Sequence, residues 1–203
     1  MEVNKIIQGD ALEVLKTFPN GSIDCLVTSP PYWNLRDYGE DNQLGLELTF
    51  HEYIDKLIAI FDEVYRILKP EGTCFVNIGD TYSGNKEGKT DRKVSAYLKD
   101  TTTRIKKRAT ITEKCLCQIP SRFAIAMTDH KWILRNRIIW YKPNAMPQSA
   151  EDRFSCDYED VFFFVKSKKY YFEQQLEKSI WAEHDARAVN GPSSGGKATS
   201  GEY

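Results

Sequence analysis

A strand-helix-strand pattern near the start of the chain constrains the fold most strongly. The apolar run at 3–7 predicts a strand, and apolar residues recur on one side of a helix predicted over 11–18, with Asp10 as its N-cap. A second apolar, partly β-branched run at 23–27 predicts a buried strand. Two strands joined through a helix form a βαβ unit, so the sequence predicts an α/β fold with a mainly parallel sheet.

The second predicted strand leads directly into a rigid corner that runs from Thr28 to Trp33. Two consecutive prolines fix the backbone there and remove two donors, which leaves the carbonyls of Ser29 and Pro30 free to accept hydrogen bonds. Tyr32 and Trp33 add flat apolar faces beside these acceptors. Such a corner suits a planar group with an amino substituent, such as a nucleobase turned out of its stack. The alternative is an ordinary strand-to-loop connection in which the prolines only end the strand.

Five further elements are predicted after this corner. Thr49 and Glu52 form a capping box for the longest helix, which runs to Leu68 and is stopped by the Pro-Glu-Gly sequence at 70–72. The strand predicted over 161–166 is apolar on both faces, so we expect it in the interior of the sheet. The others are a strand over 73–78, a helix over 119–127 and a strand over 132–141.

The composition is that of a soluble globular protein, with 203 residues, 41% of them hydrophobic and 28% charged. The chain has no apolar stretch long enough for a membrane span, and residues 1–10 do not read as a secretory signal, which favours the cytoplasm. The five cysteines lack metal-ligand spacing, so we interpret them as reduced thiols and expect no metal site. Linker-like composition divides the chain into a domain over 1–181 and a tail over 182–203.

The formal net charge of −1 means that nucleic-acid binding would depend on a local basic patch. A long stretch with little periodicity, 82–113, contains such a patch. Its basic residues are Arg104, Lys106, Lys107 and Arg108. A solvated loop is an equally good interpretation of this patch on its own.

The sequence is similar to the amino-methylating DNA methyltransferases, in the permuted group whose catalytic half precedes its cofactor half. Thr28-Ser29-Pro30-Pro31-Tyr32 matches the catalytic motif of that family, and the similarity extends almost from Met1 to Trp181. The other matching segments are Gly9-Asp10-Ala11-Leu12, Leu68-Lys69-Pro70-Glu71-Gly72-Thr73, Asn77-Ile78-Gly79-Asp80, Trp132-Ile133-Leu134-Arg135, Trp140-Tyr141-Lys142-Pro143-Asn144, and Lys166 with Tyr170-Tyr171-Phe172.

The resemblance implies direct methyl transfer from S-adenosylmethionine to an exocyclic amine of DNA. Ser29 and the Pro30 carbonyl would orient the amine, and Tyr32, which follows Pro31, would stack on the base. The cofactor contacts implied are Asp10, Ala11 and Thr28, and the DNA contacts expected are Trp33, Arg36, Tyr38 and the basic residues 104 and 106–108. The fold implied is an incomplete Rossmann-like methyltransferase sheet with helices on both faces.

Three alternatives stay open for the activity. Serine in the first motif position resembles the cytosine-N4 members, whereas aspartate there is more typical of adenine-N6 members, so we expect cytosine N4 with adenine N6 as the alternative. A non-catalytic DNA-binding protein, which would use Arg104 to Arg108 and the Lys142-Pro143-Asn144 loop, is a second alternative. An enzyme of the same class that acts on RNA or on protein amides is a third.

One expected segment is missing from the sequence. The family carries a Phe-x-Gly-x-Gly stretch on a strand for the methionine end of the cofactor, and the glycines at 191, 195, 196 and 201 lie instead in the linker-like tail. The expectation is therefore a truncated product or a second chain that supplies the other half. In the family's sheet the missing strands would lie between the strand that ends at Asp10 and the strand that ends at Ser29, so their absence would leave unpaired edges.

Overall fold

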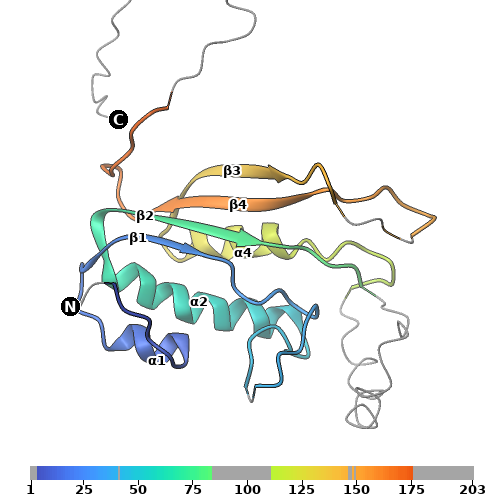
Figure 1. Cartoon of the computed structure of the whole chain (residues 1–203), viewed down its shortest axis with the longest axis horizontal. Helices are drawn as coiled ribbons and strands as arrows, with labels where there is room; N and C mark the ends of the chain where they lie inside the picture. The colour runs from blue at the N-terminus through green and yellow to red at the C-terminus, as the bar shows by residue number, and fades with distance from the viewer. Residues whose placement is uncertain (1–3, 41, 84–110, 146–147, 149, 176–203) are drawn as a thin grey trace, which may run out of the picture. The chain divides into compact units, whose positions relative to one another are not determined.

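A computed structural model describes residues 4–40, 42–83, 111–145, 148 and 150–175 of the chain. The elements are α1 (Ala11–Lys16), β1 (Ile23–Thr28), α2 (Phe50–Ile67), β2 (Leu68–Ile78), α4 (Ile119–Asp129), β3 (Ile133–Tyr141) and β4 (Tyr158–Val165), as Figure 1 shows. The α/β class predicted from the sequence is confirmed. Compact units comprise 1–171 and 172–203, and the predicted boundary at 181/182 lies outside the described residues.

The four strands of the described residues form one sheet in the order β1-β2-β4-β3. β1 pairs with β2 in parallel, and α2 forms the crossover between them. β4 pairs antiparallel with both β2 and β3. The interior position expected for 161–166 is thus confirmed, whereas the prediction of a mainly parallel sheet is wrong for the described strands. The reason is that β3 and β4 follow each other without a helical crossover, which requires them to run antiparallel.

The strand predicted over 3–7 is not formed in its described part, because residues 4–10 have no regular structure. Ile6 is 97% exposed, and β1 pairs only with β2 among the described strands. A strand needs a neighbouring strand for its backbone groups, and none of the described strands pairs with residues 4–7. The βαβ unit of the structure is therefore β1-α2-β2, which begins with the strand that ended the predicted unit.

One face of the sheet carries the hydrophobic core. The three described helices all lie on that face in Figure 1, where Phe123 of α4 packs on Phe162 and Phe164 of β4. The sequence predicted helices on both faces, but no described helix covers the opposite face, where Val27 is 76% exposed. Within the described ranges, no helix has the length and apolarity that a membrane span requires.

The long helix α2 begins and ends through local interactions. The predicted capping box is present, since Glu52 N donates to Thr49 Oγ1 at 3.2 Å and Thr49 N donates to Glu52 Oε2 at 3.3 Å. The helix ends at Ile67, and β2 begins at the next residue, so Pro70 lies within the strand instead of terminating the helix. Residues before a proline favour extended backbone, which explains the earlier helix end.

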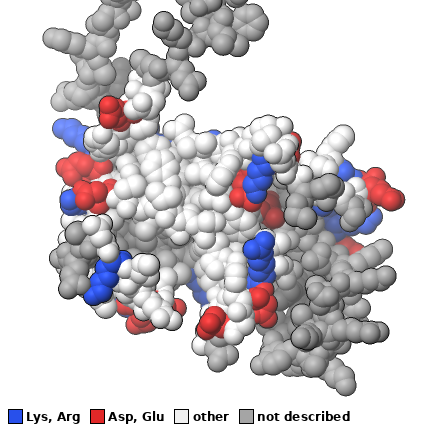
Figure 2. Space-filling view, in the orientation of Figure 1, with Lys and Arg blue, Asp and Glu red and all other residues white. Residues whose placement is uncertain are grey.

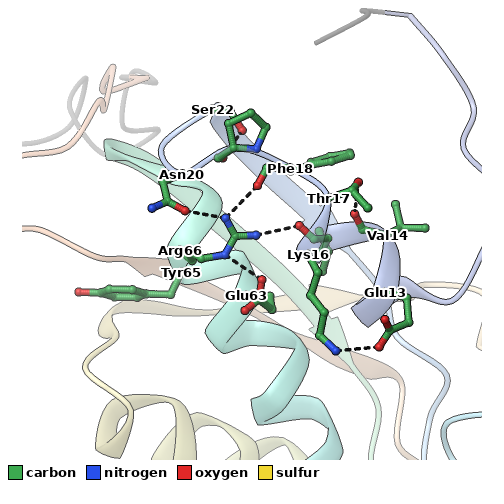
Figure 3. A network of polar contacts seen from close by, with 12 residues as sticks. Glu13, Val14, Lys16, Thr17, Phe18, Asn20, Ser22, Glu63, Tyr65 and Arg66 are labelled. Carbon is green, nitrogen blue, oxygen red and sulfur yellow. Dashed lines mark hydrogen bonds and ion pairs between the residues drawn. The ribbon is translucent and has the colours of Figure 1, made fainter.

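Arg66, at the end of α2, fixes the connection from α1 to β1 (Figure 3). Its guanidinium donates to Leu15 O at 3.0 Å, to Phe18 O at 2.8 Å and to Asn20 Oδ1 at 2.6 Å. It also pairs with Glu63 at 2.8 Å. Leu15 lies in the last turn of α1 and Phe18 lies two residues after the helix ends, so both acceptors lie where the chain leaves the helix. Arg66 thereby holds α1 against α2.

Arg66→Lys is expected to lower the free energy of unfolding by about 2 kcal/mol, because a single ammonium cannot reproduce the planar fork that reaches these acceptors. Urea denaturation measures the change. Lys16→Met is the control, since Lys16 is exposed and pairs only with exposed Glu13 among its described contacts, and its replacement is expected to change little. Equal stability of Arg66→Lys and the parent chain would contradict this role.

Candidate active site

The corner after β1 is anchored by residues of the core. Tyr53 of α2 donates its hydroxyl proton to the carbonyl of Pro31 at 2.8 Å. Trp33 is 5% exposed, and its Nε1 donates to Glu47 O at 3.1 Å. The corner therefore has a fixed backbone, and of its two aromatic residues only Tyr32 is directed to the site described next.

The Tyr32 hydroxyl lies between two acceptors from other strands. Its oxygen is 2.7 Å from Asn77 Oδ1 of β2 and 3.0 Å from Glu159 Oε2 of β4, so the phenol can donate its proton to either. Ser29 Oγ lies at the longer distances of 3.3 Å from Asn77 Oδ1 and 3.4 Å from the Tyr32 hydroxyl. The geometry brings together three elements around one hydroxyl group.

The ring of Tyr32 rests against Gly79, directly after β2. A Cβ added at Gly79 would lie 2.5 Å from Cε2 and 2.6 Å from Cδ2 of the ring, closer than side chains approach one another. The backbone at Gly79 is not in the left-handed region, so glycine is required there for space alone. The ring is thus fixed at one face and at its hydroxyl end.

Two ion pairs join β4 to β3 and to the residue after it, and the one made by Glu159 lies beside Tyr32. Lys142, which follows β3, pairs with Glu159, and Arg137 of β3 makes a two-pronged contact with Asp160 at 2.7 and 2.9 Å. Burial opposes ionisation of Glu159, but the hydrogen bonds from Lys142 and Tyr32 outweigh it and hold the pKa of this carboxyl below its ordinary value. Glu159 is therefore a carboxylate at neutral pH.

Tyr32 itself stays protonated at neutral pH. Burial of the hydroxyl is the main cause that raises its pKa to about 12, and the charge of Glu159 acts in the same direction. A neutral phenol offers a proton to Asn77 or Glu159 and leaves its ring face available for stacking. Tyr32 is thus suited to hold a planar ligand and unsuited to act as a base.

A hollow of about 330 Å³ opens in front of this group. It is lined by Ser29, Pro30, Pro31, Tyr32, Leu35, Arg36, Tyr38 and Glu159. Its volume suits a small planar molecule, and the residues around it combine oxygen acceptors with aromatic and apolar surface. Figure 2 shows that basic and acidic side chains lie next to one another on the coloured surface in view, without a broad patch of one sign.

The sequence predicted most of the lining. Ser29, Pro30, Pro31, Tyr32, Arg36 and Tyr38 line the hollow together, whereas Trp33 is buried in the core. Neither Asp10 nor Ala11 lines it: Asp10 caps α1 by accepting from Glu13 N at 3.1 Å, and Ala11 begins that helix. Thr28 is the last residue of β1 and is not part of the lining. Arg104, Lys106, Lys107 and Arg108 lie outside the described residues.

Sequence reasoning gave no role to Asn77 or Glu159, and it considered Lys142 only as part of a loop that could contact DNA. Asn77 and Lys142 lie in segments that carry the resemblance, but only the fold shows that both reach the neighbourhood of Tyr32. Glu159 lies at the start of β4, and because β4 runs antiparallel to β2, it stands at the sheet edge where β2 ends. The sequence predicted a mainly parallel sheet, so nothing in it pointed to Glu159.

Known proteins are similar to this chain both in sequence and in fold. Residues 23–201 match the N6_N4_Mtase family, described as DNA methylase. The chain is 45% identical over 172 residues to the type II methyltransferase M.XycI of Xanthomonas campestris pv. cyanopsidis, a match that covers 84% of this chain and 57% of the relative. It is 43% identical to M.Cfr9I of Citrobacter freundii, over 83% of this chain and 56% of the relative. The chain thus spans a little more than half the length of these curated relatives.

Solved structures confirm the methyltransferase fold. The PvuII DNA methyltransferase, described as cytosine-N4-specific, superposes with a TM-score of 0.56 at 22% identity, over 86% of this chain and 59% of that one. A DNA modification methylase of Thermus thermophilus, described as putative and solved in complex with S-adenosyl-L-methionine, gives a TM-score of 0.53 at 23% identity, over 82% of this chain and 55% of that one. Identities this low establish the fold alone.

Proposed function

The chain belongs to the N6_N4_Mtase family of DNA methylases, and on that premise we propose that it is the base-orienting part of an enzyme that methylates an exocyclic amine in DNA. The observation that carries this proposal is the hollow in front of the Ser29 to Tyr32 corner, with oxygen acceptors beside an aromatic ring. Its lining suits a base turned out of the duplex better than a base inside the stack.

Orientation would be the main contribution of these residues. Ser29 Oγ and the Pro30 carbonyl accept from the amine, which directs its lone pair out of the base plane, and Tyr32 stacks on the ring. Arg36 and Tyr38, in the lining of the hollow, contact the base or the DNA backbone. S-adenosylmethionine supplies the methyl group when it is bound. The new bond joins this methyl carbon to the amine nitrogen, the electrons of the broken carbon–sulfur bond stay on sulfur, and one amine proton is released.

We propose cytosine N4 as the target, with adenine N6 as the alternative. The support is Ser29 in the first motif position, where a neutral hydroxyl accepts from the amine in place of a carboxylate. Digestion of methylated DNA to nucleosides followed by mass spectrometry identifies the product, N4-methylcytosine or N6-methyladenine. The same measurement on RNA tests the remaining substrate class.

The described residues fit only part of a cofactor site. Asp10, exposed at the start of α1, can accept a hydrogen bond from an amine such as that of adenine, as can Thr28 Oγ1 at the end of β1. The sequence, however, has no Phe-x-Gly-x-Gly stretch. We propose that further polypeptide, in the same protein or in a second chain, supplies it and pairs with the edge of β1 beside exposed Val27. The greater length of the relatives supports this proposal.

Complementation tests this proposal. The chain alone is expected to bind S-adenosylmethionine weakly in calorimetry and to transfer no radiolabelled methyl group to DNA. Addition of the part of M.XycI that the chain does not match is expected to restore transfer, since 45% identity favours a compatible interface. Methylation by the chain alone would overturn the requirement for further polypeptide. DNA binding that is never accompanied by transfer would indicate a non-catalytic DNA-binding protein instead.

A further inference from the structure

The geometry around the hollow points to a residue outside the Ser29 to Tyr32 motif that determines the position of the Tyr32 ring. We infer that Glu159, together with Lys142, is a positioning residue that fixes the Tyr32 hydroxyl and thereby the ring on which the base stacks. This inference rests on the proposed function, because that function makes the Tyr32 ring the surface on which the base stacks. The contacts that carry it are present in the folded chain irrespective of any reaction.

The backbone holds both residues of the pair in place. Glu159 lies in β4 opposite Trp140 of β3, so the antiparallel register determines where its side chain stands. Lys142 follows β3 directly, and its backbone N–H donates to Asp157 O at 2.7 Å. The ammonium group of Lys142 donates to Glu159 Oε1, and the second carboxylate oxygen, Oε2, lies 3.0 Å from the Tyr32 hydroxyl. Oε1 of Glu159 thus has its own donor, and Oε2 is one of the two acceptors within reach of the phenol proton.

Lys142 offsets the cost of placing the Glu159 carboxylate in a largely buried position. The Glu159 side chain is only 21% exposed, and a carboxylate in such a position needs donors to offset the loss of hydration. Lys142 also neutralises the charge, which would otherwise repel a polyanionic substrate from a hollow that Glu159 lines. Glu159 can therefore serve as a fixed acceptor beside the base without adding a net charge.

The consequence is a ring that is held on two sides. Gly79 supports one face of the Tyr32 ring, and Glu159 with Asn77 holds the hydroxyl at its far end. Without the carboxylate, the hydroxyl loses one of its two acceptors, and the ring gains freedom to tilt about its side-chain bonds. Small displacements of a stacked base lower the rate of a reaction that depends on orientation.

Tyrosine-selective ¹³C NMR on the full chain tests the inference directly. Glu159→Gln removes the charge and keeps an acceptor, and Glu159→Leu removes both. The Tyr32 resonance is assigned through Tyr32→Phe. We expect both variants to lower the pKa of the Tyr32 hydroxyl from about 12, because the negative charge that opposes the phenolate is lost. Glu151→Gln, an exposed carboxylate on the loop before β4, is the control and should leave this pKa unchanged.

Lys142→Gln gives an independent test of the pair. Because the ammonium group is one of the causes that keep the pKa of Glu159 low, its removal should raise that pKa, as followed by the carboxyl ¹³C shift. If Tyr32 titrates alike in the parent chain and in folded Glu159→Gln and Glu159→Leu, the positioning role is overturned. Circular dichroism and melting curves establish that each variant is folded.

Activity then separates this inference from the proposed function. In the complemented enzyme, Glu159→Leu is expected to lower kcat on the order of 10- to 100-fold with little change in KM for DNA, and Glu159→Gln is expected to recover most of the loss. A KM effect alone would contradict positioning. If the parent chain shows no transfer under any condition, the proposed function fails, whereas the titration of Tyr32 still decides whether Glu159 holds the ring.

Discussion

Gly79→Ala is expected to displace Tyr32 from its position and to lower methylation by the complemented enzyme on the order of 100-fold. The added Cβ would lie 2.5 Å from the Tyr32 ring, and the site offers two ways to relieve that contact: the ring moves, or the end of β2 moves with Asn77. Either movement breaks the 2.7 Å contact between the Tyr32 hydroxyl and Asn77. Initial rates of methyl transfer and the ¹³C resonance of Tyr32 measure the two consequences.

A double-mutant cycle shows whether the ring is the cause of this effect. In a Tyr32→Leu background the contact with the ring is absent, so Gly79→Ala should add little to the loss that Tyr32→Leu already causes. Full additivity of the two substitutions would mean that Gly79 acts independently of Tyr32. That result would remove the packing argument for the glycine.

Phe123→Ala should lower the free energy of unfolding by about 4 kcal/mol, the largest stability effect that we expect. Phe123 is fully buried in α4 and contacts three other rings, with centroid distances of 5.2 Å to Phe61, 6.4 Å to Phe162 and 6.0 Å to Phe164. Its removal leaves a cavity where α2, α4 and β4 meet. Urea denaturation followed by tryptophan fluorescence measures the change in midpoint.

The matched control lies two residues away on the same helix. Ile125 is 61% exposed, so Ile125→Ala removes apolar surface that water already reaches, and alanine suits a helix at least as well. We expect the stability of this variant to remain close to that of the parent chain. A similar loss for both variants would mean that α4 is not packed on the sheet through Phe123.

The parts of the fold that were predictable depend on neighbours in the sequence. The capping box at Thr49 and Glu52 is such a case, since three residues of separation determine it. The direction of β3 and β4 and the absence of a strand at 4–7 depend instead on which strands are available as partners. No local pattern carries that information, and the predicted parallel sheet failed for this reason.

The site shows the same division between local and distant determinants. Ser29 to Tyr32 were recognised because they are adjacent and their chemistry is visible in one short motif. Asn77 and Glu159 meet the Tyr32 hydroxyl across separations of 45 and 127 residues. Only the order of strands in the sheet brings them together. Trp33 shows the converse, because adjacency to the motif favoured a role in binding, whereas its ring completes the core.

Tyr53 contributes both to the stability of the fold and to the position of the corner, through its hydrogen bond to Pro31. Selection experiments would detect this double role. Burial raises the pKa of Tyr53, so its hydroxyl keeps the proton that it donates to the corner. The same side chain is fully buried in α2. A library screened for heat resistance and one screened for turnover should therefore both reject changes at Tyr53. At the solvent-facing positions of the same helix, the two screens should diverge.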